Sequence, residues 1–154
     1  MIHIVRKAAA RAVFAVTLAA LPIQAFAAAD ITQLTADANA GKAEAQFQLG
    51  NAYMKGDGVP ANPAEALKWC RMAAEQDYVP AEMQLSLKYL NGTGVTADPV
   101  EADKWMVIAA NRESKNQSML RFVEGRMKPD DIHHGHVSAE QWMADHPVTS
   151  KPPA

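Results

Sequence analysis

The sequence predicts an all-α fold: a short α–α superhelix (solenoid) of two helix-pair repeats with N- and C-terminal capping helices. The first observation behind this is that residues 53–74 recur 36 residues later. The second is that each copy holds two stretches of apolar residues at helical spacing, separated by a glycine-rich loop. A period of this length is typical of solenoids, whose units bury their apolar faces against one another. The recurring residues are Tyr53, Gly56, Gly58, Val59, Pro63, Glu65, Ala66, Lys68, Trp69, Ala73 and Ala74, which return as Tyr89, Gly92, Gly94, Val95, Pro99, Glu101, Ala102, Lys104, Trp105, Ala109 and Ala110.

The first helix of repeat one is expected over residues 43–54, where Ala45, Leu49 and Tyr53 fall on one side. Gly56 and Gly58 end it, because two glycines one residue apart suit a tight reversal between helices. The second helix of each repeat has an explicit start signal. It consists of an N-cap residue, a proline at the first helical position and a glutamate three residues past the cap, which is the capping-box arrangement. These residues are Asn62, Pro63 and Glu65 in repeat one and Asp98, Pro99 and Glu101 in repeat two.

Alanines and one tryptophan form the inward stripe of each second helix. Small alanines let helices approach closely, and the tryptophan fills the larger gap. Trp69 and Trp105 are therefore expected to be equivalent, buried and stacked one repeat apart.

The repeated pattern resembles a known family. Ala45…Leu49-Gly50…Tyr53…Gly56-Asp57-Gly58-Val59…Asn62…Ala66…Trp69…Ala73-Ala74, with its second copy, is similar to the Sel-one-like repeat, a relative of the tetratricopeptide repeat. The resemblance covers residues 43–112. It implies an α–α superhelix and, usually, an adaptor or scaffold role, with no shared reaction.

The chain departs from the family pattern at three places. Ser86 stands where the family favours glycine, and Asp77 stands where it favours glycine at the end of the second helix. Aspartate is among the few residues that accept a left-handed conformation there. Some members of the family staple each repeat with a disulfide. Cys70 is the only cysteine, so this chain cannot do so, and a buried small hydrophobe is the preferred interpretation over pairing between chains.

The remaining segments complete the expected organisation. Residues 1–27 are typical of a signal peptide, with basic residues at its start, an apolar stretch over residues 12–23 and the small-x-small cleavage pattern Ala25-Phe26-Ala27. Residues 28–42 are expected to form an N-terminal capping helix, 43–80 repeat one, 81–116 repeat two, 117–146 C-terminal capping helices and 147–154 a flexible tail. Gly135 interrupts the apolar pattern of the last helix. One helix or two short ones are both compatible with residues 129–146.

Charge limits the class of partner. Removal of residues 1–27 takes away three basic residues, which leaves 12 Lys and Arg against 17 Asp and Glu, a formal net charge of −5. This excess of acid argues against nucleic acid and anionic membranes as partners. We expect no stable membrane anchor after cleavage and no cofactor.

The histidines near the C-terminus are weak candidates for a metal site. His133 and His136 lie three residues apart, so a helix would place both on one side. Zinc normally takes three or four ligands, and no acidic residue accompanies them in an obligatory pattern. A packed His136 with solvated His133 and His134 is the preferred interpretation, with no metal.

A second apolar stripe is the candidate binding surface. On the first helix of repeat two, Met83, Leu87 and Leu90 point nearly opposite to the repeat core. In helical-pair solenoids the first helices line the concave side, where peptides dock. The sequence is compatible with two interpretations of this stripe: it lines a groove, or the capping helices cover it. The predicted partner-binding face consists of Phe47, Asn51, Met54, Met83, Leu87, Leu90 and Asn91.

Two classes of function remain. The preferred one is an exported (periplasmic or secreted) helical-repeat protein that acts as an interaction module or scaffold for a protein or peptide. A small regulator of an envelope partner is a related form of this function. In neither form is the protein an enzyme. The alternative is a small envelope-associated hydrolase or a metal-binding protein that uses the C-terminal histidines. We identify no catalytic residues, because no pattern pairs a nucleophile or acid with a base.

Overall fold

The computed structural model describes residues 23–147, with side chains from residue 30 onwards. The expected signal peptide up to residue 22 and the expected tail from residue 148 lie outside this range. The described part is built from helices, and none of them is long and apolar enough to cross a membrane. They are α1 (Ile23–Asn39), α2 (Ala43–Lys55), α3 (Pro63–Ala74), α4 (Val79–Asn91), α5 (Pro99–Arg112), a 3₁₀ turn (Ser114–Asn116), α6 (Gln117–Glu124) and α7 (Pro129–Asp145).

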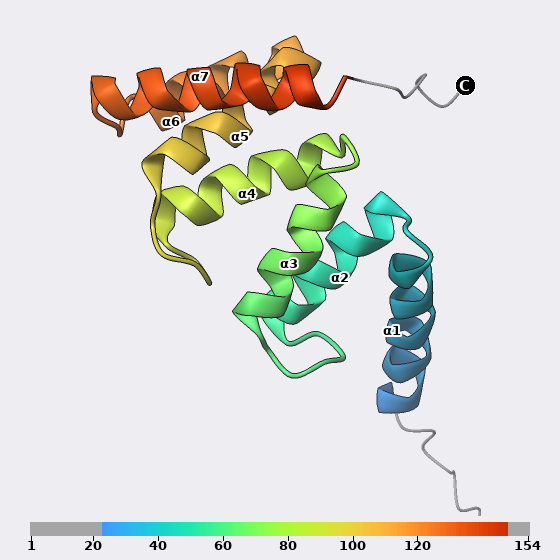
Figure 1. Ribbon diagram of the computed structural model, residues 1–154. Helices are drawn as coiled ribbons and strands as arrows, with labels where there is room; N and C mark the ends of the chain where they lie inside the picture. Colours follow the sequence, from blue (N-terminus) through green and yellow to red (C-terminus); the bar gives the residue numbers. More distant parts are fainter. Residues whose placement is uncertain (1–22, 148–154) are drawn as a thin grey trace, which may run out of the picture.

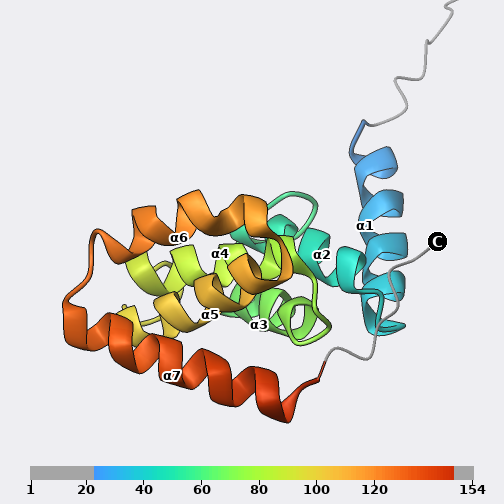
Figure 2. The ribbon, with the colours of Figure 1, turned by 90° about the horizontal axis from the view of Figure 1, so that it is seen from above.

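Successive helices pack against one another from α1 at one end of the molecule to α6, and α7 at the other end packs on α5 (Figure 1). The pairs α2–α3 and α4–α5 are the two expected repeats, and α1 packs on α2 as an N-terminal cap. At the other end α6 and α7 lie on either side of α5 (Figure 2). The predicted all-α superhelix with capping helices is confirmed.

The predicted N-cap hydrogen bonds form at the start of both second helices. Asn62 accepts hydrogen bonds from the backbone N–H groups of Ala64 and Glu65, at 3.1 and 3.2 Å. Asp98 does the same for Val100 and Glu101, at 3.0 and 3.1 Å. The second half of each expected capping box is wrong: the glutamates do not accept from the backbone N–H groups of Asn62 and Asp98, which donate to the carbonyls of Tyr53 and Tyr89. The glutamates pair with the lysine three residues further along the helix, Glu65 with Lys68 and Glu101 with Lys104.

The reversals within the repeats depend on a left-handed backbone. Gly56 and Gly92 end the first helices at φ values of 81° and 68°. Asp77, between the repeats, has a φ of 65°, and Gly41, 36 residues earlier, has a φ of 87°. The predicted left-handed conformation of Asp77 is therefore confirmed, and the family's glycine is replaced without a change of backbone.

The sequence was compatible with one helix or two short ones near the C-terminus, and the structure has one helix. Residues 129–145 form a single helix that runs through Gly135. Gly135 is buried, and a Cβ built on it would lie 2.4 Å from Asp103 Oδ2. The glycine is thus a close-packing residue between α5 and α7, not a helix end.

The core is divided into two apolar clusters. The smaller one contains Ala38, Ala45, Leu49 and Trp69, where α1 meets the first repeat. The larger one runs from Cys70 to Ala139 and includes Leu85, Trp105 and Ile108. Trp69 and Trp105 are both buried, at 8% and 1% exposure, but they belong to different clusters. The predicted burial of both tryptophans is confirmed, and each occupies the same position of its own repeat, one in each cluster.

Candidate functional site

The seven residues of the predicted partner-binding face lie on the first helices of the two repeats. Phe47, Asn51 and Met54 occupy successive turns of α2, and Met83, Leu87, Leu90 and Asn91 occupy those of α4. Asn91 is exposed and the other six are half-buried. Both helices therefore present the same register positions on one side of the superhelix.

Two of these residues, Phe47 and Asn51, also make contacts at the junction with α4, where Tyr78 is the N-cap residue and Gln84 lies in the helix. The ring of Phe47 packs against that of Tyr78, with centroids 5.4 Å apart. Asn51 Oδ1 accepts a hydrogen bond of 2.7 Å from Gln84 Nε2 on α4. Gln84 Oε1 in turn accepts from the thiol of the buried Cys70 at 3.2 Å. Burial raises the pKa of this thiol, so Cys70 behaves as a packed, inert group.

The sequence left open whether the apolar side chains of α4 line an exposed groove or are buried, and in the structure they are partly buried. Met83, Leu87 and Leu90 pack against the larger core cluster, yet part of each side chain stays accessible. Met54 on α2 is half-buried and belongs to neither cluster. The face is thus part core and part surface.

An open hollow of about 600 Å³ adjoins this face, between α1 and α2. Its lining includes the apolar residues Ile31, Leu34 and Ala52 and the acidic residues Asp30 and Asp57. The amides of Gln48 and Asn51 also line it. Asn51 therefore belongs both to the predicted face and to the hollow, which makes the two surfaces continuous.

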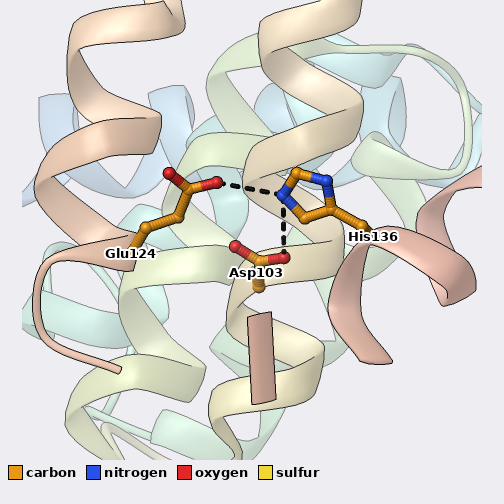
Figure 3. Close-up of side chains that lie close together, drawn as sticks. All are labelled: Asp103, Glu124 and His136. Carbon is orange, nitrogen blue, oxygen red and sulfur yellow. Dashed lines mark hydrogen bonds and ion pairs between the residues drawn. The ribbon is translucent and has the colours of Figure 1, made fainter. Parts of the chain in front are cut away.

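A second constellation lies at the C-terminal end of the molecule, where Asp103 of α5, Glu124 of α6 and His136 of α7 converge (Figure 3). His136 Nε2 lies 2.9 Å from Glu124 Oε1 and 3.6 Å from Asp103 Oδ2. The Asp103 side chain is fully buried, whereas those of Glu124 and His136 are 23% and 43% exposed. The cluster thus reaches from the core to solvent.

The pKa of the Asp103 carboxyl group is unusually high for an aspartate. Burial raises the pKa of Asp103 to about 6, with Glu124 adding to the rise and His136 opposing it. Neither carboxylate oxygen of Asp103 has a hydrogen-bond partner among the described residues. An ionised, buried and unbonded carboxylate is costly, so the group favours either a proton or a positively charged ligand.

The comparisons with known proteins now identify the repeats. Residues 43–78 and 79–114 each match the family model described as Sel1 repeat. The chain carries two Sel1 repeats. No curated protein matches the chain.

The solved structures that resemble the chain include the following two. One is a protective antigen present in uropathogenic Escherichia coli strains and displaying an SLR fold; it is 24% identical with a TM-score of 0.71, over 82% of this chain and 30% of that one. The other is a Sel1 repeat protein from Oxalobacter formigenes, 30% identical with a TM-score of 0.59, over 74% of this chain and 50% of that one. The chain spans no more than half the length of either, and the first likeness shows the fold alone.

The cluster around His136 was not predicted from the sequence. His136 was expected to be packed, and it is partly so, while His133 and His134 are exposed. Asp103 and Glu124 were not recognised as its neighbours. A signal was present, because Asp103 occupies the position of Leu67 in the first Sel1 repeat. An acidic residue at a register position that is apolar in the other repeat indicates a special environment.

Proposed function

We propose that this protein is an exported module that binds a segment of a protein partner along the α2–α4 face and the adjoining hollow. Sel1 repeats are generally protein-interaction modules, which sets the class of function. The single observation that carries the choice of surface is the row of half-buried apolar side chains at equivalent positions of the two first helices. Side chains of this kind lose further apolar surface to water when a partner covers them.

The composition of the surface suggests the chemistry of the partner. Met54, Leu87 and Leu90 offer apolar contacts, and Asp30 and Asp57 add negative charge at the hollow. The mature chain would carry a formal net charge of −5. A partner segment with apolar side chains and at least one basic residue complements this surface, whereas nucleic acid does not.

Export is part of the proposal and rests on the N-terminal sequence. The contacts of the cap also support it, because Ile31, Leu34 and Ala38, which pack in or against the smaller core cluster, all follow the expected cleavage site at Ala27. Cleavage would therefore leave the packing of α1 on α2 intact. Mass spectrometry of the protein recovered from cells should find an N-terminus within two residues of Ala28. An intact Met1 terminus in the cytoplasm would rule export out.

Binding is tested by affinity capture from envelope extract with the mature chain, followed by a direct titration with the recovered partner. Met54→Glu is the milder variant, because Met54 lies outside both core clusters, and Leu90→Glu is the more stringent one. Both should weaken binding at least about tenfold, since each places a charge in an apolar contact. Val137→Glu on α7, where the side chain is 52% exposed, is the matched control and should bind normally.

Circular dichroism and thermal melts separate loss of binding from loss of structure. Met54→Glu should retain the helical signal and the melting temperature of the parent chain. If it folds and binds with unchanged affinity, the partner docks elsewhere and the α2–α4 face is excluded.

A further inference from the structure

We propose that Asp103, Glu124 and His136 form a zinc site that joins the C-terminal cap to the second Sel1 repeat. The three residues come from three different helices, α5, α6 and α7, and they turn their ligand atoms toward one point (Figure 3). The site is separate from the α2–α4 face, so it goes beyond the proposed partner binding and does not depend on it.

The first argument is the state of the Asp103 carboxylate. Its side chain is fully buried, and neither oxygen has a hydrogen-bond partner among the described residues. Burying an ionised carboxylate without a partner is expensive, and such groups are normally paired or bound to a metal. The imidazole of His136, at 3.6 Å, is too distant for a hydrogen bond. A cation between Asp103 and His136 would satisfy the carboxylate.

The second argument is geometric. A tetrahedral zinc ion with ligand bonds of about 2.0–2.2 Å separates its ligand atoms by roughly 3.3–3.6 Å. His136 Nε2 lies 2.9 Å from Glu124 Oε1 and 3.6 Å from Asp103 Oδ2, and all three ligand atoms lie within 4.8 Å of one another. These separations bracket the tetrahedral value, so small rotations of the two partly exposed side chains would bring three ligands onto one ion.

The third argument is that the neighbouring residues let α7 approach Asp103 closely and give an ion access from solvent. Gly135 lets α7 lie directly against Asp103, since a Cβ there would come within 2.4 Å of Oδ2. The residue next to His136 is thus the one that permits the close approach of the helices. On the other side, Glu124 and His136 are partly exposed, which gives an ion a path from solvent and leaves a fourth position for water.

The donor set indicates the kind of metal. One imidazole nitrogen with two carboxylate oxygens suits Zn²⁺, which accepts both ligand types in a four-coordinate site. Mg²⁺ and Ca²⁺ prefer six or more oxygen ligands, which three side chains including an imidazole do not provide. A zinc ion held between α5, α6 and α7 would fix the cap to the repeat, because each helix supplies one ligand.

The proposal is tested with the untagged mature chain, freed of metal with a chelator and then dialysed. Titration calorimetry with ZnCl₂ should show one ion per chain, and thermal melts should show a melting temperature that rises with zinc concentration. MgCl₂ at the same concentrations should give neither. His136→Ala and Glu124→Gln should each weaken zinc binding at least about tenfold, since changes even to groups behind a ligand have effects of this size. His133→Ala, which removes an exposed imidazole from the same helix, should bind zinc as the parent does.

Three results would overturn the proposal. The first is a folded parent chain that takes up no zinc. The second is zinc binding that falls with His133→Ala and not with His136→Ala, which would place the ion on the exposed histidines. The third is an equal response to Mg²⁺. Asp103→Asn adds a further measurement, because the isosteric amide should lower zinc affinity while the metal-free chain remains folded. Should that variant fail to fold, the two partly exposed ligands still decide the question.

Discussion

Arg112 at the end of α5 donates from Nε to the fully buried carboxylate of Glu82 on α4, at 2.6 Å. The same connection exists one Sel1 repeat earlier without charge. Gln76, 36 residues before Arg112, donates to Gln46, 36 residues before Glu82, also at 2.6 Å. The two repeats thus share one hydrogen bond between the end of the second helix and the start of the first, and only the second repeat makes it an ion pair.

This relationship predicts how the ion pair can be replaced. Arg112→Gln alone should destabilise the fold by about 3–5 kcal/mol at pH 8, because it leaves the carboxylate of Glu82 buried without its cation. The double variant Glu82→Gln/Arg112→Gln should recover most of that loss, since it installs the pair found in the first repeat. Urea unfolding followed by circular dichroism measures both. A double variant no more stable than Arg112→Gln would show that the two junctions are not equivalent.

Glu82 also makes stability depend on pH. Burial raises its pKa to about 7, although Arg112 opposes the rise. Between pH 4.5 and 7 the folded chain therefore binds more protons at this site than the unfolded chain, and the unfolding free energy falls as pH rises. The stabilisation is fully present below about pH 4.5 and lost on passing pH 7. The parent chain should lose on the order of 2 kcal/mol more than the double variant between pH 4.5 and 8.

Unfolding at those two pH values in the presence of a chelator checks this prediction. The chelator removes any contribution of metal. The titrating groups other than Asp77, which loses its ion pair with Arg112 in the double variant, keep their partners in both chains and cancel in the comparison. An identical pH dependence in the parent and the double variant would contradict it.

The parts of the fold that sequence could predict are those specified locally. Asn62 and Asp98 mark the start of the second helices, because their side chains accept hydrogen bonds from backbone groups two and three residues ahead. Gly56 and Gly92 mark the ends of the first helices, because glycine readily adopts the left-handed backbone found there. These signals need no knowledge of distant residues. The residues of the proposed partner-binding face could be grouped on one side of α2 and α4 for the same reason, since helical periodicity alone puts them there.

The parts that sequence could not predict depend on the return of α6 and α7 onto α5. The 36-residue register ends before α6, so no spacing relates Glu124 or His136 to Asp103. Gly135 likewise reads as a helix break in the sequence, and only its contact with Asp103 explains why the helix continues through it. The degree of burial of Met83 and Leu90 was also undetermined, because it depends on how closely the caps approach.

The two tryptophans should respond differently to the same change. Trp105 is 1% exposed, packs against Trp142 at a centroid distance of 5.5 Å and donates from its indole N–H to Glu101 at 3.2 Å. The buried indole N–H of Trp69 has no hydrogen-bond partner among the described residues. Trp105→Ala should therefore cost about 3–5 kcal/mol.

Substitution by phenylalanine separates the two sites further. It removes an unsatisfied donor at Trp69 but a made hydrogen bond at Trp105, so Trp105→Phe should cost about 1 kcal/mol more than Trp69→Phe. Chemical denaturation of the three single variants gives the comparison. Equal losses for the two phenylalanine variants would show that the indole hydrogen bonds do not contribute.

Gly135→Ala tests the close packing of α7 on α5. On an exposed helix this change would stabilise the fold by about 1 kcal/mol, because alanine is the better helix former. Here the added Cβ would lie 2.4 Å from Asp103 Oδ2 and 2.5 Å from Asp103 Cβ, so α7 must shift. Overpacking of this kind costs about 1–3 kcal/mol, and the net effect should be destabilising. Asp103→Ala should not relieve it, because the Cβ contact remains. Thermal melts in chelator, with Val137→Ala at a 52% exposed position as the control, measure the difference. A more stable Gly135→Ala chain would mean that α7 does not approach α5 at this residue.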